Sequence, residues 1–340
     1  MKQTDFAKTL TRFLSDYLPN QRNVSTNTIK SYRDTFKQML IFYKLEKQIK
    51  PEHLTFKFIK AESIKAFLLW LEKTRNVSIN TRNQRLAAVH SFFRYVQTEN
   101  PENMFECQRI LGIPFKKRQK KTIEFLSLEC LKSILNQPDT STKNGRRDLA
   151  LIATLYDTGA RVQELIDLRV RDIRLSEPAT ITLTGKGNKR RSVPIMNKTQ
   201  NLIEAYMKEN ALLDNGKQDH PLFYNNKRHP FTRPGITYIL EKHFKLAKKK
   251  DIEILFPEKI HPHMIRHTKA MHLLESGVNL IYIRDFLGHV NVTTTDIYLR
   301  ANSEIKRKAL EEAYIEVVTQ DMPVWYEDTD LLNWLEDFCK

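Results

Sequence analysis

Six polar side chains between positions 161 and 298 are of the types that attack on a phosphodiester requires. They comprise a phenol, an amine, two imidazoles and two guanidiniums, at Arg161, Lys186, His263, Arg266, His289 and Tyr298. Guanidinium forks match phosphate oxygens, imidazoles and amines move protons, and an ionised phenol is a nucleophile. The set therefore predicts phosphoryl-transfer chemistry with Tyr298 as the attacking group.

The spacing of the two arginines and His263 favours a shared phosphate site. His263 and Arg266 are three residues apart, which places both on one face of a helix that begins after Pro262. Arg161 follows a helix-ending glycine and begins the next helix, where Glu164 can brace its guanidinium from one turn later. A simple surface ion pair is the alternative for Arg161 and Glu164 taken alone.

Lys186 and Tyr298 lie in segments marked by turn and cap residues. Lys186 stands between two glycines at the predicted tip of a β-hairpin, where an ammonium group can protonate a leaving oxygen. Gly288 ends a helix, His289 follows in the turn, and Tyr298 lies about one turn inside a short next helix. A phenol, whose pKa is about 10, needs a cationic surrounding to ionise. An exposed turn lysine and a packing tyrosine are the ordinary interpretations.

A histidine cluster raises the alternative of a metal site, at His261, His263 and His267. The second and third of these are spaced four residues apart, but the glutamate of an HExxH motif is missing and no carboxylate-rich ligand set is nearby. The sequence also lacks the GxxxxGK[ST] loop of ATP-binding proteins. We therefore predict that these histidines do not form a metal site and that the chain has no ATP site of this type.

Residues 1–110 are predicted to form a small helical domain that binds DNA. Apolar residues recur at helical spacing in four segments, 6–18, 28–43, 63–73 and 80–96. Polar clusters at 25–28 and 78–81 suit helix N-caps, and basic side chains follow each cluster. Groove or phosphate contacts are predicted from these side chains, Lys30, Arg33, Arg82 and Arg85. A solvated polar face is the alternative.

Residues 111–123 are predicted to be a linker, because helical periodicity stops in a segment rich in lysine and arginine. Lys116 and Lys117 are expected to lie along a phosphate backbone, and a nuclear-localisation signal is the alternative interpretation. The catalytic domain is assigned to residues 124–318, and residues 319–340 form a separate acidic tail.

The pattern of residues 124–318 is mainly α with a small antiparallel β-sheet. Helical periodicity is present in 127–135, 145–158, 198–212, 234–248, 264–276, 279–287, 294–298 and 303–318. The extended segments 180–184 and 191–195 flank a glycine-containing turn, which predicts a β-hairpin. Basic residues at this turn are predicted to contact DNA phosphates, with solvent exposure as the alternative, at Lys189, Arg190 and Arg191.

The composition favours two domains and a polyanionic partner. The chain has 340 residues, of which 41% are hydrophobic, and a net charge of +16, which is typical of nucleic-acid binding. Its three cysteines have no CxxC spacing, which fits a reducing cytosol. No signal-peptide pattern is present, and no stretch reaches the about 18 apolar residues of a membrane span. A cytoplasmic protein without a membrane partner is predicted.

Four segments taken together resemble the tyrosine recombinases of the phage integrase family. They are 158–165, 185–189, 263–268 and 287–298, and their pattern is close to that of Xer-type and transposon-borne members. The resemblance covers the catalytic domain, whereas residues 1–110 match only the helical architecture of the family's core-binding domain. It implies a two-domain clamp around double-stranded DNA and a homo-oligomer, expected as a tetramer on paired DNA sites.

The resemblance also implies a mechanism without metal or ATP. Tyr298 would attack a phosphodiester and form a 3′-phosphotyrosyl link, while the two arginines stabilise the phosphate charge. His263 is implied as the general base, Lys186 as the acid toward the 5′ oxygen and His289 as a phosphate hydrogen-bond donor. Two alternatives share parts of this pattern: a type IB topoisomerase, which relaxes DNA without pairing sites, and a DNA-binding regulator with a vestigial site.

The acidic tail, residues 319–340, holds six acidic side chains against one lysine. Aromatic and leucine side chains recur in 324–326 and 331–338, and such an apolar stripe is expected to pack on a surface. Docking on the tail's own domain is one interpretation. The resemblance implies another, in which a C-terminal helix passes to a neighbouring protomer. The tail is also expected to shield basic surface when DNA is absent.

Overall fold

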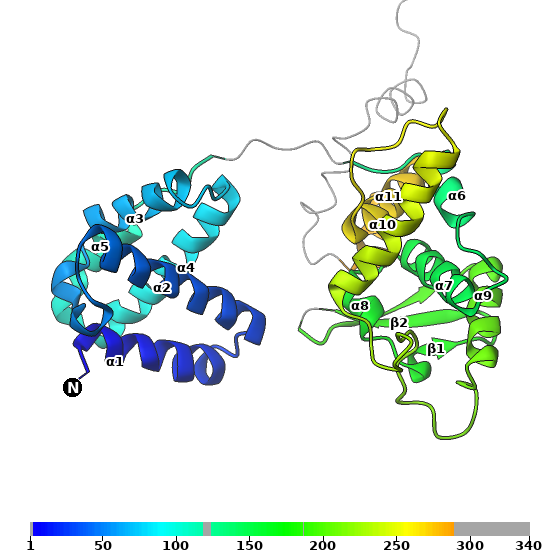
Figure 1. Cartoon of the computed structure of the whole chain (residues 1–340). Helices are drawn as coiled ribbons and strands as arrows, with labels where there is room; N and C mark the ends of the chain where they lie inside the picture. Colours follow the sequence, from blue (N-terminus) through cyan, green and yellow to red (C-terminus); the bar gives the residue numbers. More distant parts are fainter. Residues whose placement is uncertain (1–2, 118–123, 186, 289–340) are drawn as a thin grey trace, which may run out of the picture. The chain divides into compact units, whose positions relative to one another are not determined.

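The chain folds into two units. The computed structural model describes residues 3–117, 124–185 and 187–288, and its contacts divide the chain into residues 1–121 and residues 122–340. Figure 1 shows the first unit as a bundle of helices and the second as helices around a small sheet. The predicted fold class, mainly α with a small antiparallel sheet, is confirmed.

Within residues 3–117, every regular element of the first unit is a helix. These elements are α1 (Asp5–Arg12), η1 (Phe13–Gln21), α2 (Thr26–Glu46), η2 (Pro51–His53), η3 (Phe56–Phe58), α3 (Ala61–Lys73), α4 (Ile79–Glu99), η4 (Pro101–Asn103) and α5 (Met104–Leu111). Ser25 and Ser78 cap α2 and α4 by accepting hydrogen bonds from the amides of Thr28 and Thr81, as the polar clusters predicted. The sequence analysis did not predict α5.

Aromatic side chains fill the centre of the first unit. The ring of Phe92 meets Phe36 and Phe13 edge to face, with centroids 5.0 Å and 5.2 Å apart. Phe42 of α2 and Phe67 of α3 are 5.7 Å apart in the same core. Such aromatic pairs stabilise a fold by about 0.5–1.5 kcal/mol beyond the burial of their area. The core thus ties α2, α3 and α4 together.

The first residues of the predicted linker are bound to the helical unit. Asn83 of α4 is buried, and its side chain donates to the Lys116 carbonyl at 2.9 Å and accepts from the Lys116 amide at 3.1 Å. Arg82 is also buried and donates from Nη1 to the Pro114 carbonyl at 3.2 Å. The predicted DNA contact of Arg82 is therefore corrected, because its guanidinium faces inward and holds the departing chain.

Replacing Asn83 with alanine is expected to release the segment around Lys116. A buried hydrogen bond contributes about 0.5–1.5 kcal/mol, so the Lys116 amide should exchange with solvent about tenfold faster. Hydrogen exchange of the full chain, read by mass spectrometry, measures this rate. Asn80 is exposed in the first turn of the same helix, and Asn80→Ala should leave the rate unchanged. Equal exchange in Asn83→Ala and wild type would contradict the anchor.

The second unit surrounds a three-stranded antiparallel sheet of order β1-β2-β3. Its described elements are α6 (Leu128–Leu135), α7 (Lys143–Thr158), α8 (Val162–Ile166), η5 (Val170–Asp172), β1 (Ile173–Arg174), β2 (Thr180–Thr184), β3 (Arg190–Pro194), α9 (Asn197–Glu209), α10 (Arg233–Lys250), α11 (Pro262–Glu275) and α12 (Leu280–Leu287). The predicted hairpin is confirmed, whereas β1 was missed because it is only two residues long. The helices predicted at 294–298 and 303–318 lie outside the described residues.

Helix α7 organises the second unit. It lies beside α9 and also packs against α11, which in turn contacts α12 (Figure 1). β2 contacts α8, the short helix that follows the end of α7. The packing therefore brings together the C-terminal ends of α7 and α12, the start of α8 and the N-terminal half of α11.

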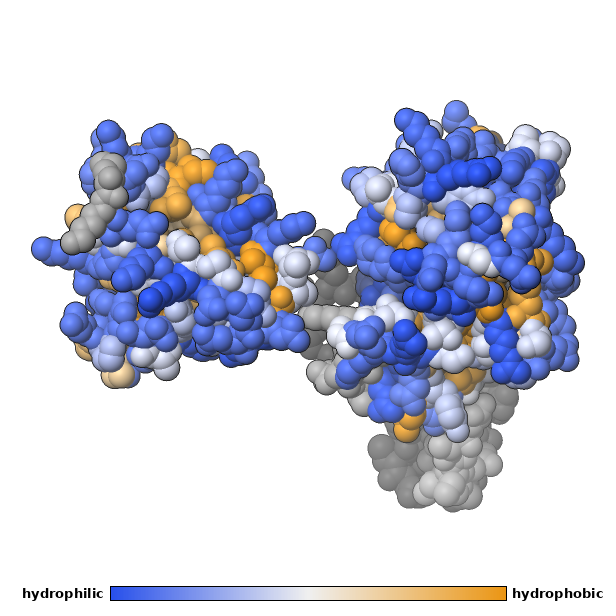
Figure 2. Space-filling view, turned by 90° about the horizontal axis from the view of Figure 1, so that it is seen from below, coloured by the Kyte–Doolittle hydropathy of each residue, from blue (hydrophilic) through white to orange (hydrophobic). Residues whose placement is uncertain are grey.

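Figure 2 shows mostly hydrophilic residues on the face in view, with smaller hydrophobic patches between them. Of the helices in the described ranges, 3–117, 124–185 and 187–288, none is both long and apolar enough to cross a membrane.

Candidate active site

Arg161 is positioned by the junction between α7 and α8. α7 ends at Gly159, whose φ of 56° lies in the left-handed region that glycine adopts at low cost. Arg161 is then the N-cap of α8, and Glu164 closes the first turn by accepting from the Arg161 amide at 2.8 Å and from its Nη1 at 2.6 Å. The predicted brace is confirmed. The Arg161 side chain remains 38% exposed, so its guanidinium is open to a ligand.

Arg266 lies in the second turn of α11, is completely buried and joins two helix ends. Its Nη1 donates to the Gly159 carbonyl at 2.7 Å, and its Nη2 donates to the Leu287 carbonyl at 2.6 Å. The carbonyls at the end of a helix lack hydrogen-bond donors within the helix and carry the negative end of its dipole. A guanidinium placed there supplies both the donors and a compensating positive charge. Arg266 thus fixes the ends of α7 and α12 against each other.

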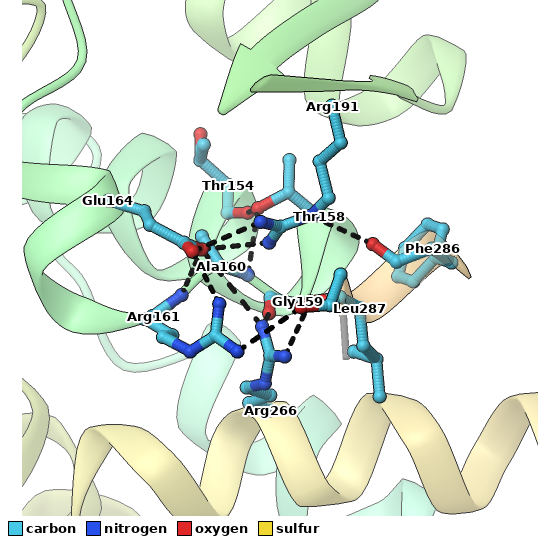
Figure 3. Close-up of polar contacts among 11 residues, drawn as sticks. Thr154, Thr158, Gly159, Ala160, Arg161, Glu164, Arg191, Arg266, Phe286 and Leu287 are labelled. Atoms are coloured by element: carbon cyan, nitrogen blue, oxygen red, sulfur yellow. Dashed lines mark hydrogen bonds and ion pairs between the residues drawn. The ribbon is translucent and has the colours of Figure 1, made fainter. Parts of the chain in front are cut away.

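Glu164 is the centre of the cluster drawn in Figure 3, where three guanidiniums surround its carboxylate. Besides Arg161, it accepts from Arg191 at 3.0 Å and 2.7 Å, and Nη1 of Arg266 lies 4.0 Å away. Burial favours the neutral acid, but the hydrogen bonds and charge of Arg191 and Arg161 outweigh it and lower the pKa of Glu164 to about 2. The carboxylate is therefore ionised at neutral pH, and the cluster keeps a net positive charge.

The segments that carry Lys186 and His289 begin beside this cluster. A Cβ placed on Gly185 would lie 3.1 Å from Glu164 Oε1 and 3.7 Å from Arg161 Nη1, so the hairpin turn starts against the pair. The Gly288 carbonyl accepts from Arg161 Nη2 at 3.4 Å. Lys186, His289 and Tyr298 themselves lie outside the described residues. The residues that precede Lys186 and His289 both contact the Arg161 site.

His263 projects from the same helix as Arg266, as the three-residue spacing predicted. Partial burial and the charge of Arg266 lower its pKa below the ordinary value, which keeps the imidazole neutral at pH 7. The rings of His263 and His267 have centroids 4.6 Å apart, and burial beside His263 lowers the pKa of His267 to about 4. His261 has a structural role, because its Nδ1 caps α11 by accepting from the Met264 amide at 3.0 Å.

The histidines do not form a metal site in the structure as described. Across residues 3–117, 124–185 and 187–288, no group of three or more His, Cys, Asp or Glu side chains is placed to hold a metal ion.

The predicted DNA contacts divide into exposed and internally bonded side chains. The exposed ones are Lys30, Arg33, Lys116, Lys117, Lys189 and Arg190. Two of these have surface partners: Arg33 pairs with Asp34, and Lys116 pairs with Glu72. Arg85 donates to the Ser31 carbonyl at 2.9 Å and is partly buried.

The predicted phosphate contact of Arg191 is corrected by the structure. Its side chain is only 12% exposed and is bound to Glu164, so it is not the phosphate contact that its place near the turn suggested. Sequence reasoning missed this role, although a signal was available. Alternate residues of a strand share a face, and Arg191 is two residues from the buried Val193 in β3.

Two family models cover most of the chain. Residues 124–304 match the phage integrase family, and residues 10–101 match the phage integrase N-terminal SAM-like domain. The chain belongs to the phage integrase family. Tyrosine recombinases that are 30% identical over 86–88% of this chain show that it is a tyrosine-type site-specific recombinase.

Relatives are similar over nearly their whole length. The integrase/recombinase homologue y4rC of Sinorhizobium fredii (strain NBRC 101917 / NGR234) is 37% identical, covering 91% of this chain and 92% of that protein. The tyrosine recombinase XerC of Bacillus subtilis (strain 168) is 30% identical, with 88% and 94% covered. The solved XerH recombinase, in a post-cleavage complex with palindromic difH substrate, is 25% identical, with TM-score 0.66 and coverage of 90% and 84%.

The fold is also shared with more distant solved proteins. The Tn1549 transposon integrase in complex with a circular intermediate DNA is 17% identical, with a TM-score of 0.67 and coverage of 89% of this chain and 99% of that one. At this identity the likeness shows the fold alone.

Proposed function

We propose that this recombinase cuts and rejoins double-stranded DNA through Tyr298. The phenolate oxygen attacks phosphorus, the bond from phosphorus to the 5′ oxygen breaks, and a 3′-phosphotyrosyl link and a 5′-hydroxyl result. Because the new link conserves the energy of the phosphodiester, rejoining needs no ATP. The observation that carries the proposal is Arg161: braced by Glu164 and still 38% exposed, it is a preorganised cation open to a phosphate.

Each of the other groups has a role in the same step. Arg266 holds the two helix ends that form the phosphate site and adds a buried positive charge to it, and the exposed Arg161 stabilises charge on the non-bridging oxygens. The neutral imidazole of His263 accepts the phenol proton, and Lys186 protonates the departing 5′ oxygen. His289 donates a hydrogen bond to the phosphate. The arginines supply the positive charge that attack on phosphate needs, so we propose a reaction without a metal or other cofactor.

The rate of covalent linkage is expected to rise with pH as His263 loses its proton. Because the pKa of His263 is lowered, this rise should lie below the ordinary histidine value of about 6.5. His263→Ala should lose the rise and slow linkage by about 10²–10⁴-fold. Single-turnover rates across pH measure this. His229→Ala, at an exposed histidine, is the control with an unchanged profile. A wild-type profile retained in His263→Ala would exclude His263 as the base.

The partner is proposed to be double-stranded DNA, held in a clamp made by the two units. The exposed basic residues of the first unit and of the hairpin turn would contact its phosphates, and these contacts predict weaker binding at higher salt. We propose that four copies assemble on two paired DNA sites and that the acidic tail, residues 319–340, connects neighbouring copies. Sedimentation of the DNA complex with and without the tail tests this assembly.

A covalent trap tests the proposed reaction. A pool of nicked duplexes with randomised sequence is incubated with the protein, and strands that stay attached after denaturation are sequenced. Wild type should yield attached strands with a shared sequence, and Tyr298→Phe should yield none. Tyr282→Phe, at an exposed tyrosine of α12, should behave as wild type.

Three outcomes contradict the proposal. Attached strands in Tyr298→Phe would exclude this nucleophile. Attachment without a shared sequence, with relaxation of any supercoiled plasmid, would indicate a type IB topoisomerase instead. Binding without attachment in wild type would indicate a regulator with a vestigial site.

A further inference from the structure

Arg191 connects three parts of the site through one side chain. Its Nη1 and Nη2 bind both oxygens of Glu164, at 3.0 Å and 2.7 Å, and its Nε donates to the Phe286 carbonyl at 3.0 Å. A Cβ on Gly288 would lie 3.0 Å from Arg191 Cδ, so the side chain also abuts the end of α12. Figure 3 shows Arg191 reaching from the hairpin between Glu164 and Phe286.

The place of Arg191 in the hairpin gives these contacts a specific effect. Arg191 pairs with Leu183 in the ladder, and the next pair, Thr184 with Arg190, is the last before the turn that contains Lys186. The turn itself is closed by a hydrogen bond from the Gly185 amide to the Lys189 carbonyl at 2.8 Å. Arg191 therefore connects the hairpin rigidly to the Glu164 carboxylate that braces Arg161. It does so one ladder pair away from the turn.

We propose that Arg191 is a positioning residue for the acid step: it holds the hairpin so that Lys186 reaches the 5′ oxygen of the phosphate bound at Arg161. This inference rests on the proposed function. The planar fork is essential, because only a guanidinium can bind both carboxylate oxygens and a carbonyl at once. A lysine at this position would keep the charge and lose the geometry. A displacement of about 1 Å at a reacting group can cost about 10²-fold in rate.

The leaving group provides a test that a general loss of structure would not mimic. In a substrate whose bridging 5′ oxygen is replaced by sulfur, the departing group is a thiol with a pKa of about 8.5, which leaves as the thiolate without a proton donor. Mispositioning of Lys186 should therefore slow cleavage of the oxygen substrate and spare the sulfur substrate. The ratio of the two rates does not depend on the fraction of protein that is folded.

The experiment compares Arg191→Ala, Arg191→Lys and wild type on both substrates, as full chains in single-turnover cleavage. Both variants should lose about 10²-fold with the oxygen substrate and recover most of that loss with sulfur. Their DNA affinity should stay within about threefold of wild type. Arg174→Ala, at an exposed arginine of β1, should match wild type on both substrates.

Two results would overturn the inference. Equal losses on the two substrates would place the role of Arg191 outside the acid step, and wild-type rates in Arg191→Lys would show that the fork is unnecessary. Failure of the proposed function can be distinguished from failure of this inference, because wild type itself would then cleave neither substrate. That result would also overturn the inference, which rests on the proposed function.

Discussion

Replacing Arg161 with alanine is expected to slow covalent linkage by about 10²–10³-fold while leaving the fold intact. Its guanidinium is 38% exposed, and Glu164 keeps its ion pair with Arg191 when Arg161 is removed. Removing a partly exposed ion pair costs about 1 kcal/mol of the free energy of unfolding. The loss should therefore appear in the reaction and hardly in stability.

Arg266→Ala should behave differently, because this side chain is completely buried. Its removal leaves the Gly159 and Leu287 carbonyls without their donor and opens a cavity, at a cost of about 3–5 kcal/mol. Linkage should be lost together with stability. Native-state hydrogen exchange of α7 and α11 measures the stability of the second unit, and covalent linkage measures activity. Arg171→Ala, at an exposed arginine, serves as the control for both.

The contrast between the two arginines is the test. Equal destabilisation of the second unit by Arg161→Ala and Arg266→Ala would contradict these assignments. Arg161 is assigned as a cation exposed to the phosphate, and Arg266 as a buried side chain that joins two helix ends.

Glu164→Gln is the second change with a large expected effect, and its signature is a dependence on pH. The pKa of Glu164 falls from 4.5 to about 2 in the folded chain. A carboxyl group with a depressed folded pKa stabilises the protein fully above its unfolded pKa, and this stabilisation is lost as pH falls through the folded value. The shift corresponds to about 3 kcal/mol, and the side chain is only 3% exposed, so solvent screening is small.

The free energy of unfolding of wild type should therefore exceed that of Glu164→Gln by about 3 kcal/mol near pH 7. The difference should shrink as pH falls from about 4.5 to about 2, where wild type also carries a neutral group. Hydrogen exchange of α7 and α8 at several pH values measures it. Glu253→Gln, at an exposed glutamate, should follow wild type throughout. If the difference in the free energy of unfolding did not change with pH, the three guanidiniums would not lower the pKa of Glu164.

Local chemistry in the sequence predicted the elements well. Ser25, Ser78 and Gly159 mark helix ends by properties of their own side chains and backbones, and the structure places each of them at such an end. The hairpin followed from alternation on both sides of a glycine turn. The spacing of His263 and Arg266, and the brace between Arg161 and Glu164, were predictable because both are contacts within one helical turn.

The partners of Arg82 and Arg191 could not be predicted in the same way. Arg191 binds a carboxylate 27 positions earlier and a carbonyl 95 positions later, and Arg82 binds a carbonyl 32 positions away. A basic side chain near a turn or cap looks the same in sequence whether it faces DNA or a buried acid. Tertiary packing decides between these two cases, and the one signal in the sequence for Arg191 was its place two residues before the apolar Val193 in the predicted strand.

The glycine at the end of α7 also restricts how this protein can vary. A Cβ at Gly159 would lie 2.9 Å from Leu287 Cδ2, at the point where Arg266 ties the two helix ends together. Phe286 Cε1 would lie 3.2 Å away, and any side chain at 159 would also have to adopt a φ of 56°, which L-residues other than glycine rarely do. A library that randomises position 159 will therefore return almost only glycine, whichever residue position 287 carries.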